Sequence, residues 1–127
     1  MIVSIGIDMI EVRRVRVIIE RTSRFVARVF TPGERAYCEG HGAAAAQHYA
    51  ARFAAKEAAL KALGTGWRGG LKWQDVEVVS NEAGAPALVF HNQARTLLQQ
   101  TGADTAHLTI SHTNEHAVAQ VILERRG

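Results

Sequence analysis

The chain has 127 residues, of which 47% are hydrophobic and 21% charged, and its formal net charge is +3. This is ordinary globular composition, and we expect residues 1–127 to form a single domain. No long uncharged apolar run is present, so the sequence indicates neither a transmembrane helix nor a signal peptide. Cys38 is the only cysteine, which excludes an intramolecular disulfide and fits a reducing, cytoplasmic setting, and no Cys/His cluster has zinc spacing.

The N-terminal segment predicts a strand followed by two helices. In residues 2–8, apolar side chains alternate with Ser4, Gly6 and Asp8, which is the period of a half-buried strand. Asp8 therefore points with the small residues at the carboxyl end of the strand. We expect a helix over about 10–20, then a short helix containing residues 25–29 and capped by Thr22 or Ser23.

Residues 10–35 are strongly basic. They contain three glutamates, at 11, 20 and 34, against seven arginines, namely Arg13, Arg14, Arg16, Arg21, Arg24, Arg28 and Arg35. Such a patch favours an acidic partner, which could be an acidic protein, a phosphorylated small molecule or a nucleic acid. The alternative interpretation is a solvated helix face without a partner.

A capping signal precedes the longest predicted helix. Thr31 suits the N-cap position, Pro32 the first helical position, and Glu34 completes a capping box. This short helix should end near Gly40 or Gly42. A long, alanine-rich helix then runs over about 43–63, and Gly64 ends it.

The remaining segments predict a loop, two hairpins and one helix. Residues 64–70 are glycine-rich and form a loop that lets the backbone approach a ligand closely. Residues 74–80 and 86–91 form a hairpin, Asn92 caps a helix that ends at Gly102, and the last strands cover about 107–111 and 117–124. This order is not the alternation of a doubly wound sheet, so we expect an α+β fold with a mostly antiparallel sheet packed against the long central helix. Apolar strand faces left exposed would need an oligomer to complete the core.

Glu57 is the most informative residue of the long helix. It shares one side of the helix with Phe53 and Leu60, which should face the core. A carboxylate at the edge of a core-facing side needs a compensating partner, and either Lys61, one turn further on, or a metal ion would serve. The alternative is an ordinary solvated i,i+4 pair, which contributes about 0.2–0.5 kcal/mol.

The polar residues suggest magnesium and phosphate chemistry. Asp8 and Glu57 offer oxygen ligands without a cysteine or histidine cluster, and this donor set favours Mg²⁺ over zinc. Lys61 would add a charge for phosphate, and the 64–70 loop would close over a phosphorylated ligand. Ser111 and His112 do not suit a nucleophile and its base, because neighbouring strand residues point to opposite faces; His112 fits a ligand contact better.

Three motifs together resemble a known family. They are Gly6-Ile7-Asp8-Met9-Ile10-Glu11-Val12 with Arg14, the segment 52–66, and Ile110-Ser111-His112-Thr113. Phe30-Thr31 with Glu34, residues 73–78, and Gly84 with Pro86 add to the set. The chain is similar over nearly its whole length to the holo-[acyl-carrier-protein] synthases, the short-chain class of 4′-phosphopantetheinyl transferases.

The resemblance implies an activity and a set of site residues. The family transfers the 4′-phosphopantetheine arm of coenzyme A to a serine of apo acyl carrier protein and releases adenosine 3′,5′-bisphosphate. By position, Asp8 and Glu57 match its Mg²⁺ ligands and Lys61 a lysine near the reacting phosphate. The residues that match the coenzyme A site are Arg52, Gly64, Thr65, Gly66, His112 and Thr113. Either Glu57 or a metal-bound water would accept the serine proton.

The resemblance also implies partners and an assembly. Arg14 matches a basic position that receives the acidic carrier protein, and family members are homotrimers with active sites between subunits. Neither a nucleic acid nor a membrane partner is implied. One departure is visible, since the family often has Gly-Lys-Pro where this chain has Gly84-Ala85-Pro86, and a phosphate contact from that lysine is missing.

Two other functions stay open at the level of the sequence. One is a non-catalytic basic trimer that binds nucleic acid or a phosphorylated ligand, which would not need Asp8 and Glu57 together. The other is a Mg²⁺-dependent phosphohydrolase, which would use the same site with water as the acceptor. The sequence equally leaves open whether fatty acid biosynthesis or polyketide synthesis uses the product.

Overall fold

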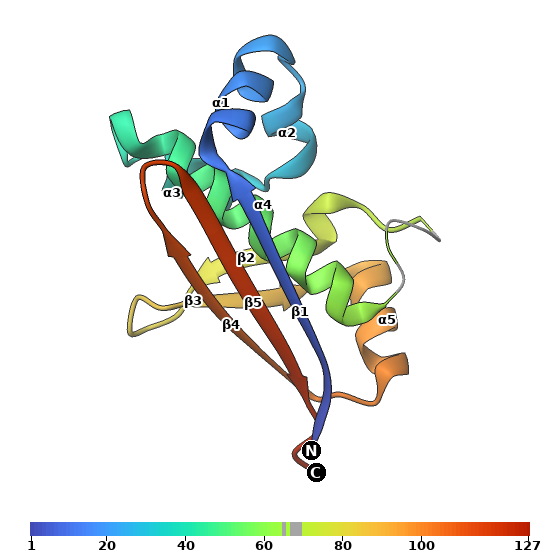
Figure 1. The fold of residues 1–127 in the computed structure, drawn as a ribbon. Helices are drawn as coiled ribbons and strands as arrows, with labels where there is room; N and C mark the ends of the chain where they lie inside the picture. Colours follow the sequence, from blue (N-terminus) through green and yellow to red (C-terminus); the bar gives the residue numbers. More distant parts are fainter. Residues whose placement is uncertain (65, 67–69) are drawn as a thin grey trace.

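The computed structural model describes residues 1–64, 66 and 70–127 of the chain. A long helix, α4 (Ala45–Leu63), lies at the centre, and a three-stranded sheet and a two-stranded hairpin pack against it (Figure 1). The strands pair in antiparallel fashion in both sheets. Within the described ranges, no helix combines the length and apolar character needed to cross a bilayer. The expected α+β fold, with its antiparallel sheet against a long central helix, is confirmed.

The three-stranded sheet brings together the two ends of the chain. Its order is β1-β5-β4, and the strands are β1 (Ile2–Glu11), β4 (Thr105–His112) and β5 (His116–Glu124). The Met1 amino group donates a hydrogen bond to the Arg125 carbonyl oxygen at 2.8 Å. Both termini therefore lie at the same end of the sheet (Figure 1).

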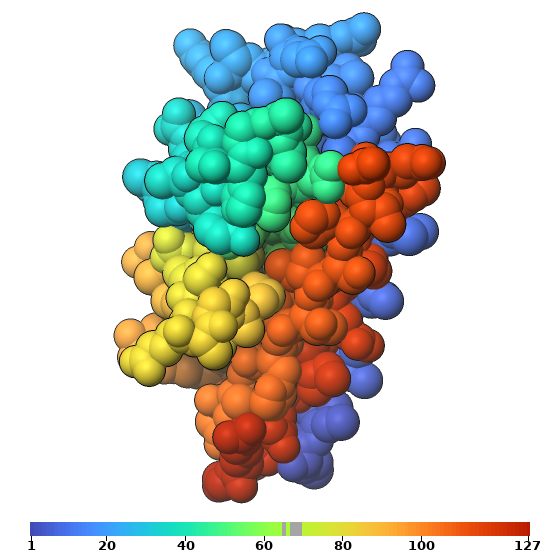
Figure 2. Space-filling model, turned by 90° about the vertical axis from the view of Figure 1, so that its left-hand side faces the viewer, coloured from blue at the N-terminus to red at the C-terminus, as the bar shows by residue number. Residues whose placement is uncertain are grey.

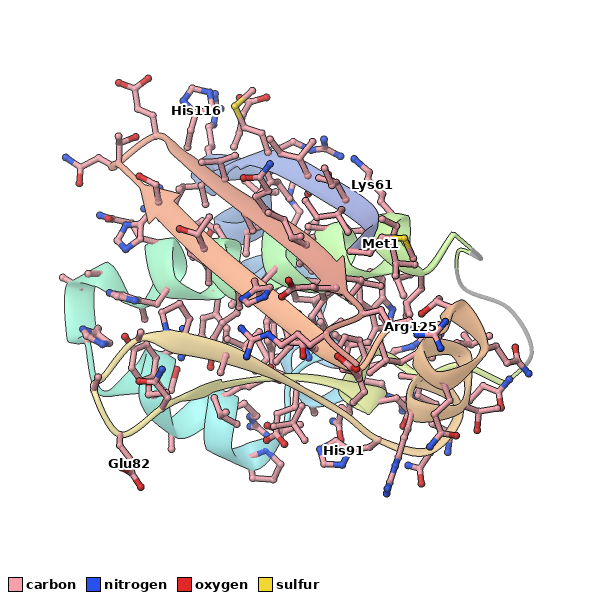
Figure 3. All side chains as sticks on the ribbon, turned by 90° about the horizontal axis from the view of Figure 1, so that it is seen from below. Met1, Lys61, Glu82, His91, His116 and Arg125 are labelled. Carbon is pink, nitrogen blue, oxygen red and sulfur yellow. The ribbon has the colours of Figure 1, made fainter. Side chains whose placement is uncertain are left out.

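The side chains of β1 alternate as predicted, but the apolar ones face outward. Gly6 is buried and Asp8 half-buried toward α4, whereas Ile5, Ile7 and Met9 are 55%, 55% and 67% exposed. The reason is steric, because β1 touches the α4 backbone at Gly6 and only small side chains fit around this contact. Ile10, further along the same face of the strand, is buried in the core. In Figure 3 the outer face of this sheet carries side chains without a covering helix or strand from the described part of the chain.

Three short helices lie at one end of α4 (Figure 1), namely α1 (Val12–Arg21), α2 (Phe25–Val29) and α3 (Pro32–Glu39). The predicted capping box of α3 is confirmed: the Glu34 N–H donates to Thr31 Oγ1 at 3.2 Å, and the Thr31 N–H donates to Glu34 Oε1 at 2.8 Å. The predicted cap of α2 by Thr22 or Ser23 is wrong. Arg24 takes that position without a side-chain capping bond.

The hairpin and the helix after it also follow the prediction. The hairpin strands are β2 (Val76–Ser80) and β3 (Pro86–Phe90), the helix is α5 (Asn92–Thr101), and the short 3₁₀ turns are η1 (Gly42–Ala44) and η2 (Trp73–Asp75). Asn92 does not cap α5 as expected, since His91 holds the N-cap position. The Asn92 side chain instead donates to Asp75 Oδ1 at 3.1 Å, which ties α5 to η2.

A fully buried ion pair fastens α4 to the hairpin and to α3. Lys56 Nζ lies 2.9 Å from Glu34 Oε1, and both side chains are 0% exposed. The same ammonium donates to the carbonyl oxygens of Trp73 and Val76, and the Val78 N–H donates to Glu34 Oε2 at 2.7 Å. Burial lowers the pKa of Lys56, while the Glu34 carboxylate favours its charged form. These polar groups satisfy one another in the core.

We expect Lys56→Met to lower the free energy of unfolding by about 3–5 kcal/mol, because it leaves the Glu34 carboxylate buried without its counter-charge. Urea denaturation followed by circular dichroism measures this change. The matched control is Lys61→Met on the same helix, where the lysine side chain is 56% exposed and its ion pair should contribute less than about 1 kcal/mol. Equal losses in the two variants would refute a stabilising role of the buried pair.

Candidate active site

The carboxyl-terminal half of α4 carries the predicted carboxylate and lysine on one side. Glu57 is half-buried and Lys61, one helical turn further on, is exposed. The helix ends at Gly64, whose φ of 78° is in the left-handed region that favours glycine. Glu57, Lys61 and Gly64 line one open hollow together with Leu60 and Gly66.

Gly6 brings β1 into direct contact with the backbone of α4. A Cβ atom at Gly6 would overlap the Ala58 carbonyl oxygen and lie 2.8 Å from the Ala62 nitrogen. Ser4 Oγ, on the same face of β1, donates to the Ala62 carbonyl oxygen at 2.6 Å. The strand therefore runs along the helix at the closest distance that two backbones allow, and this fixes where Asp8 lies.

Asp8 meets Lys61 at the edge of the hollow. Lys61 Nζ lies 3.1 Å from Asp8 Oδ1 and donates to the Ile7 carbonyl oxygen at 2.9 Å. Figure 3 shows the labelled Lys61 at the side of the sheet where β1 passes the end of α4. The structure thus brings Asp8 into contact with Lys61. Lys61 in turn lines the same hollow as Glu57. Lys61 was expected to pair with Glu57, and in the structure it forms an ion pair with Asp8.

The donor set at this hollow suits a hard divalent cation with phosphate. Among the described residues, no group of three or more His, Cys, Asp and Glu side chains is arranged to enclose a metal. Two carboxylates are nevertheless what Mg²⁺ commonly takes from a protein, because water and substrate phosphates complete its coordination. The ammonium group of Lys61 adds a positive charge for phosphate. Asp8 and Glu57 therefore suit a Mg²⁺ ion that shares its coordination with water and substrate, and not a metal enclosed by protein ligands alone.

A second pocket, of about 150 Å³, lies between α3, α4, the hairpin and β4. Figure 2 looks onto this face, where the cyan α3 region, the yellow hairpin and the orange β4 meet. Arg52 and His112 line it, together with Tyr37, His48, Ala51, Ser80, Gly84, Pro86 and Ile110. Arg52 is only 4% exposed, and its buried Nε has no hydrogen-bond partner within the described part of the chain. A buried guanidinium with an unused donor indicates an anion site.

Three lining residues of this pocket, Tyr37, His48 and Ser80, were missed by sequence reasoning. The sequence offers a signal for His48, because it precedes Arg52 by one helical turn and this spacing places both side chains on one side of the helix. The pKa of His48 is lowered to about 4, mainly by burial and then by repulsion from His41, His112 and Arg52. The His48 imidazole is therefore neutral at neutral pH.

Two groups that resemble nucleophiles lack the surroundings that would activate them. Ser111 and His112 are neighbours on β4 opposite Val118 and Ala117, and His112 Nδ1 lies 3.1 Å from Gln47 Oε1. Cys38 is buried, and burial raises the pKa of its thiol to about 12, so it stays protonated.

The structure separates the remaining predicted residues. Arg52 and Lys61 are nine positions apart on α4, which is roughly 13 Å along a helix axis. The Thr113 hydroxyl accepts hydrogen bonds from the N–H groups of Glu115 and His116, and so holds the turn between β4 and β5. Thr65 lies outside the described residues. One chain therefore presents two separate polar sites.

Arg14 lies exposed on α1, within the basic surface predicted from the sequence. All seven arginines of residues 10–35 are exposed, whereas Glu34 is buried in its pair with Lys56. Only Glu11 and Glu20 remain to offset the arginines at the surface. This surface is consequently more basic than the sequence suggests, and an acidic macromolecule would complement it.

Comparison with known proteins identifies close relatives over the full chain. Residues 4–121 match the family model of the 4′-phosphopantetheinyl transferase superfamily. The holo-[acyl-carrier-protein] synthase of Koribacter versatilis is 50% identical over 98% of this chain and 99% of its own length. The crystal structure of a holo-(acyl-carrier-protein) synthase from Bacillus anthracis in complex with CoA (3′,5′-ADP) is 39% identical, covers 98% of each chain and has a TM-score of 0.80. That of Neisseria meningitidis is 29% identical over 98% of this chain and 100% of its own, with a TM-score of 0.86.

Proposed function

Since the chain belongs to the holo-[acyl-carrier-protein] synthases of the 4′-phosphopantetheinyl transferase superfamily, we propose that it moves the 4′-phosphopantetheine arm of coenzyme A to a serine of an acyl carrier protein. The serine hydroxyl gives its proton to Glu57 or a water molecule, and its oxygen forms a bond to the phosphorus that carries the arm. The bridging bond to the other phosphate breaks, and adenosine 3′,5′-bisphosphate leaves. The observation that supports this reaction best is the contact of Lys61 Nζ with Asp8 Oδ1 at 3.1 Å, beside the hollow that Glu57 lines.

Asp8 and Glu57 are the residues that would hold Mg²⁺. When bound, the cation would offset the negative charge of the pyrophosphate. Lys61 is exposed at the mouth of the hollow, so its ammonium group can turn from Asp8 to the departing phosphate and stabilise its charge. The backbone at Gly64 and Gly66 lets the donor come close to the end of α4, because no side chain intervenes.

The pocket lined by Arg52 and His112 would bind another part of the same coenzyme A molecule. Arg52 and His112 would bind an anionic part of coenzyme A, and Thr113 supports them by holding the turn after β4. Thr65 would complete the loop beside Gly64. The two sites lie apart on one chain, so a donor that needs both is served best where two subunits meet. This separation supports active sites between the subunits of a homotrimer.

The outer face of the three-stranded sheet is the surface that we assign to trimer contacts. Ile5 lies opposite Ile122, Ile7 opposite Gln120 and Met9 opposite Val118, so the outer face of β1 and β5 is largely apolar. Ile5, Ile7 and Met9 are more than half exposed in the single chain. Apolar patches of this kind on soluble proteins usually mark an interaction site. We place the enzyme in the cytoplasm, because its lone cysteine is buried and has no partner with which to form a disulfide within the chain.

The first test is the transfer itself. Intact-mass spectrometry should show an apo acyl carrier protein gaining one phosphopantetheine arm when it is incubated with coenzyme A, Mg²⁺ and this protein. EDTA should abolish the gain, and Glu57→Gln should slow it at least about a hundredfold. Glu82→Gln at the tip of the hairpin is the matched control and should retain full activity (Figure 3). Release of the free arm without modification of the carrier would instead favour a phosphohydrolase.

The basic surface of α1 should govern carrier-protein binding. Arg14→Glu is expected to raise KM for the carrier protein about fivefold and leave kcat and Mg²⁺ dependence unchanged, because it reverses charge at a docking surface. Arg95→Glu makes the same charge change on α5, which lies well away from α1 (Figure 1), and should leave KM unaltered. If both variants changed KM equally, or if neither changed it, the carrier protein would not dock on the basic surface of α1.

The oligomer should depend on the outer sheet face. We expect Ile7→Lys to convert the trimer into monomers in light scattering coupled to size exclusion, and to abolish transfer, because an ammonium group would be buried at the interface. Val89→Lys is the matched control, since Val89 is also an exposed apolar strand residue but lies on β3. A trimeric Ile7→Lys variant would exclude this face as the interface.

A further inference from the structure

The Arg52 side chain is held by the aromatic ring of Tyr37. Its Cζ atom lies 3.7 Å from the centroid of the Tyr37 ring, a stacking distance for a guanidinium on an aromatic face. The side chain is 4% exposed, and its Nε has no partner among the residues described. A buried cation fixed in this way keeps its full charge available to a ligand.

Stacking directs the donors of Arg52 into the pocket. A guanidinium carries five N–H groups in one plane, and an aromatic ring contacts the face of that plane. The N–H groups at the edge remain available for a planar, bidentate contact with phosphate oxygens. A carboxylate partner would instead use those same N–H groups and neutralise the charge.

Two histidines support the ring of Tyr37 from the side. The ring of His48 lies 5.5 Å away in an edge-to-face arrangement, and that of His41 lies 4.8 Å away. His41 and His48 stack on each other at 3.7 Å. Because burial lowers the pKa of His48 to about 4, its imidazole is neutral and adds little repulsion beside Arg52. Tyr37 is thus kept in place although it is 39% exposed.

We propose that Tyr37 is a positioning residue whose ring orients the Arg52 guanidinium for binding a phosphate group of the coenzyme A donor. The inference rests on the proposed function and adds to it a residue that acts through Arg52. Coenzyme A carries a pyrophosphate and a separate phosphate on its ribose. Both present anionic phosphate oxygens that a guanidinium can bind, so the experiment must separate them.

Isothermal titration calorimetry of coenzyme A with the wild-type protein, Tyr37→Leu and Tyr37→Phe tests this role without any turnover. Tyr37→Leu should weaken binding about threefold to tenfold, which corresponds to the loss of one partly desolvated cation–π contact. Tyr37→Phe retains the ring and should restore wild-type affinity. In an Arg52→Gln background, Tyr37→Leu should have no further effect.

A parallel titration with 3′-dephospho-coenzyme A identifies the phosphate. If Tyr37→Leu no longer weakens binding of this ligand, Arg52 binds the ribose phosphate; if the loss persists and still depends on Arg52, it binds the pyrophosphate. Either result supports the inference.

Three results would overturn the inference. They are unchanged affinity in Tyr37→Leu, equal losses of affinity in the Leu and Phe variants, or an undiminished loss in the Arg52→Gln background. Should Arg52→Gln fail to fold, the contrast between the Leu and Phe variants decides. Failure of the proposed function would appear separately, as absent transfer by the wild-type protein.

Discussion

The close contact of β1 with α4 is the constraint on which the rest of the structure depends. It requires a residue without a side chain at Gly6, where a Cβ would overlap the helix backbone at Ala58. With the strand held at this distance, Asp8 two residues later lies within reach of Lys61. The same contact leaves no room for Ile5 and Ile7 on the helix side, so they face outward. One steric requirement therefore sets both the polar site and the apolar face.

Charges that look similar in the sequence have different roles in the structure. Lys56 and Lys61 are five positions apart on α4, yet Lys56 is enclosed in the core with Glu34 and Lys61 is exposed beside Asp8. The first holds α3, α4 and the hairpin together, and the second contacts Asp8 at the edge of an open hollow. Because Glu34 is used inside, the surface around Arg14 keeps a larger excess of positive charge. Interior packing and surface electrostatics are thus linked through one residue.

The arrangement of the two polar sites bears on how a large donor would be bound. Lys61 and Arg52 are on the same helix but roughly 13 Å apart along it, and they belong to different pockets. The outer sheet face, with Ile7 at its centre, is the surface that would bring copies of the chain together. Assembly would then complete both the core and the catalytic site. A carrier protein approaching the basic surface of α1 would meet a donor held by two subunits.

The sequence by itself determined most elements of the fold, since the strand alternation before Asp8, the Thr31 capping box and the stop at Gly64 are local signals that depend on neighbouring residues alone. Its motifs also placed the chain in a family and named Asp8, Glu57 and Lys61 as candidates. Only the tertiary structure decided that Lys61 pairs with Asp8, that the apolar side of β1 faces outward, and that Tyr37 stacks on Arg52. These contacts join residues 15 to 53 positions apart or depend on how closely two elements pack, and no local pattern encodes such distances.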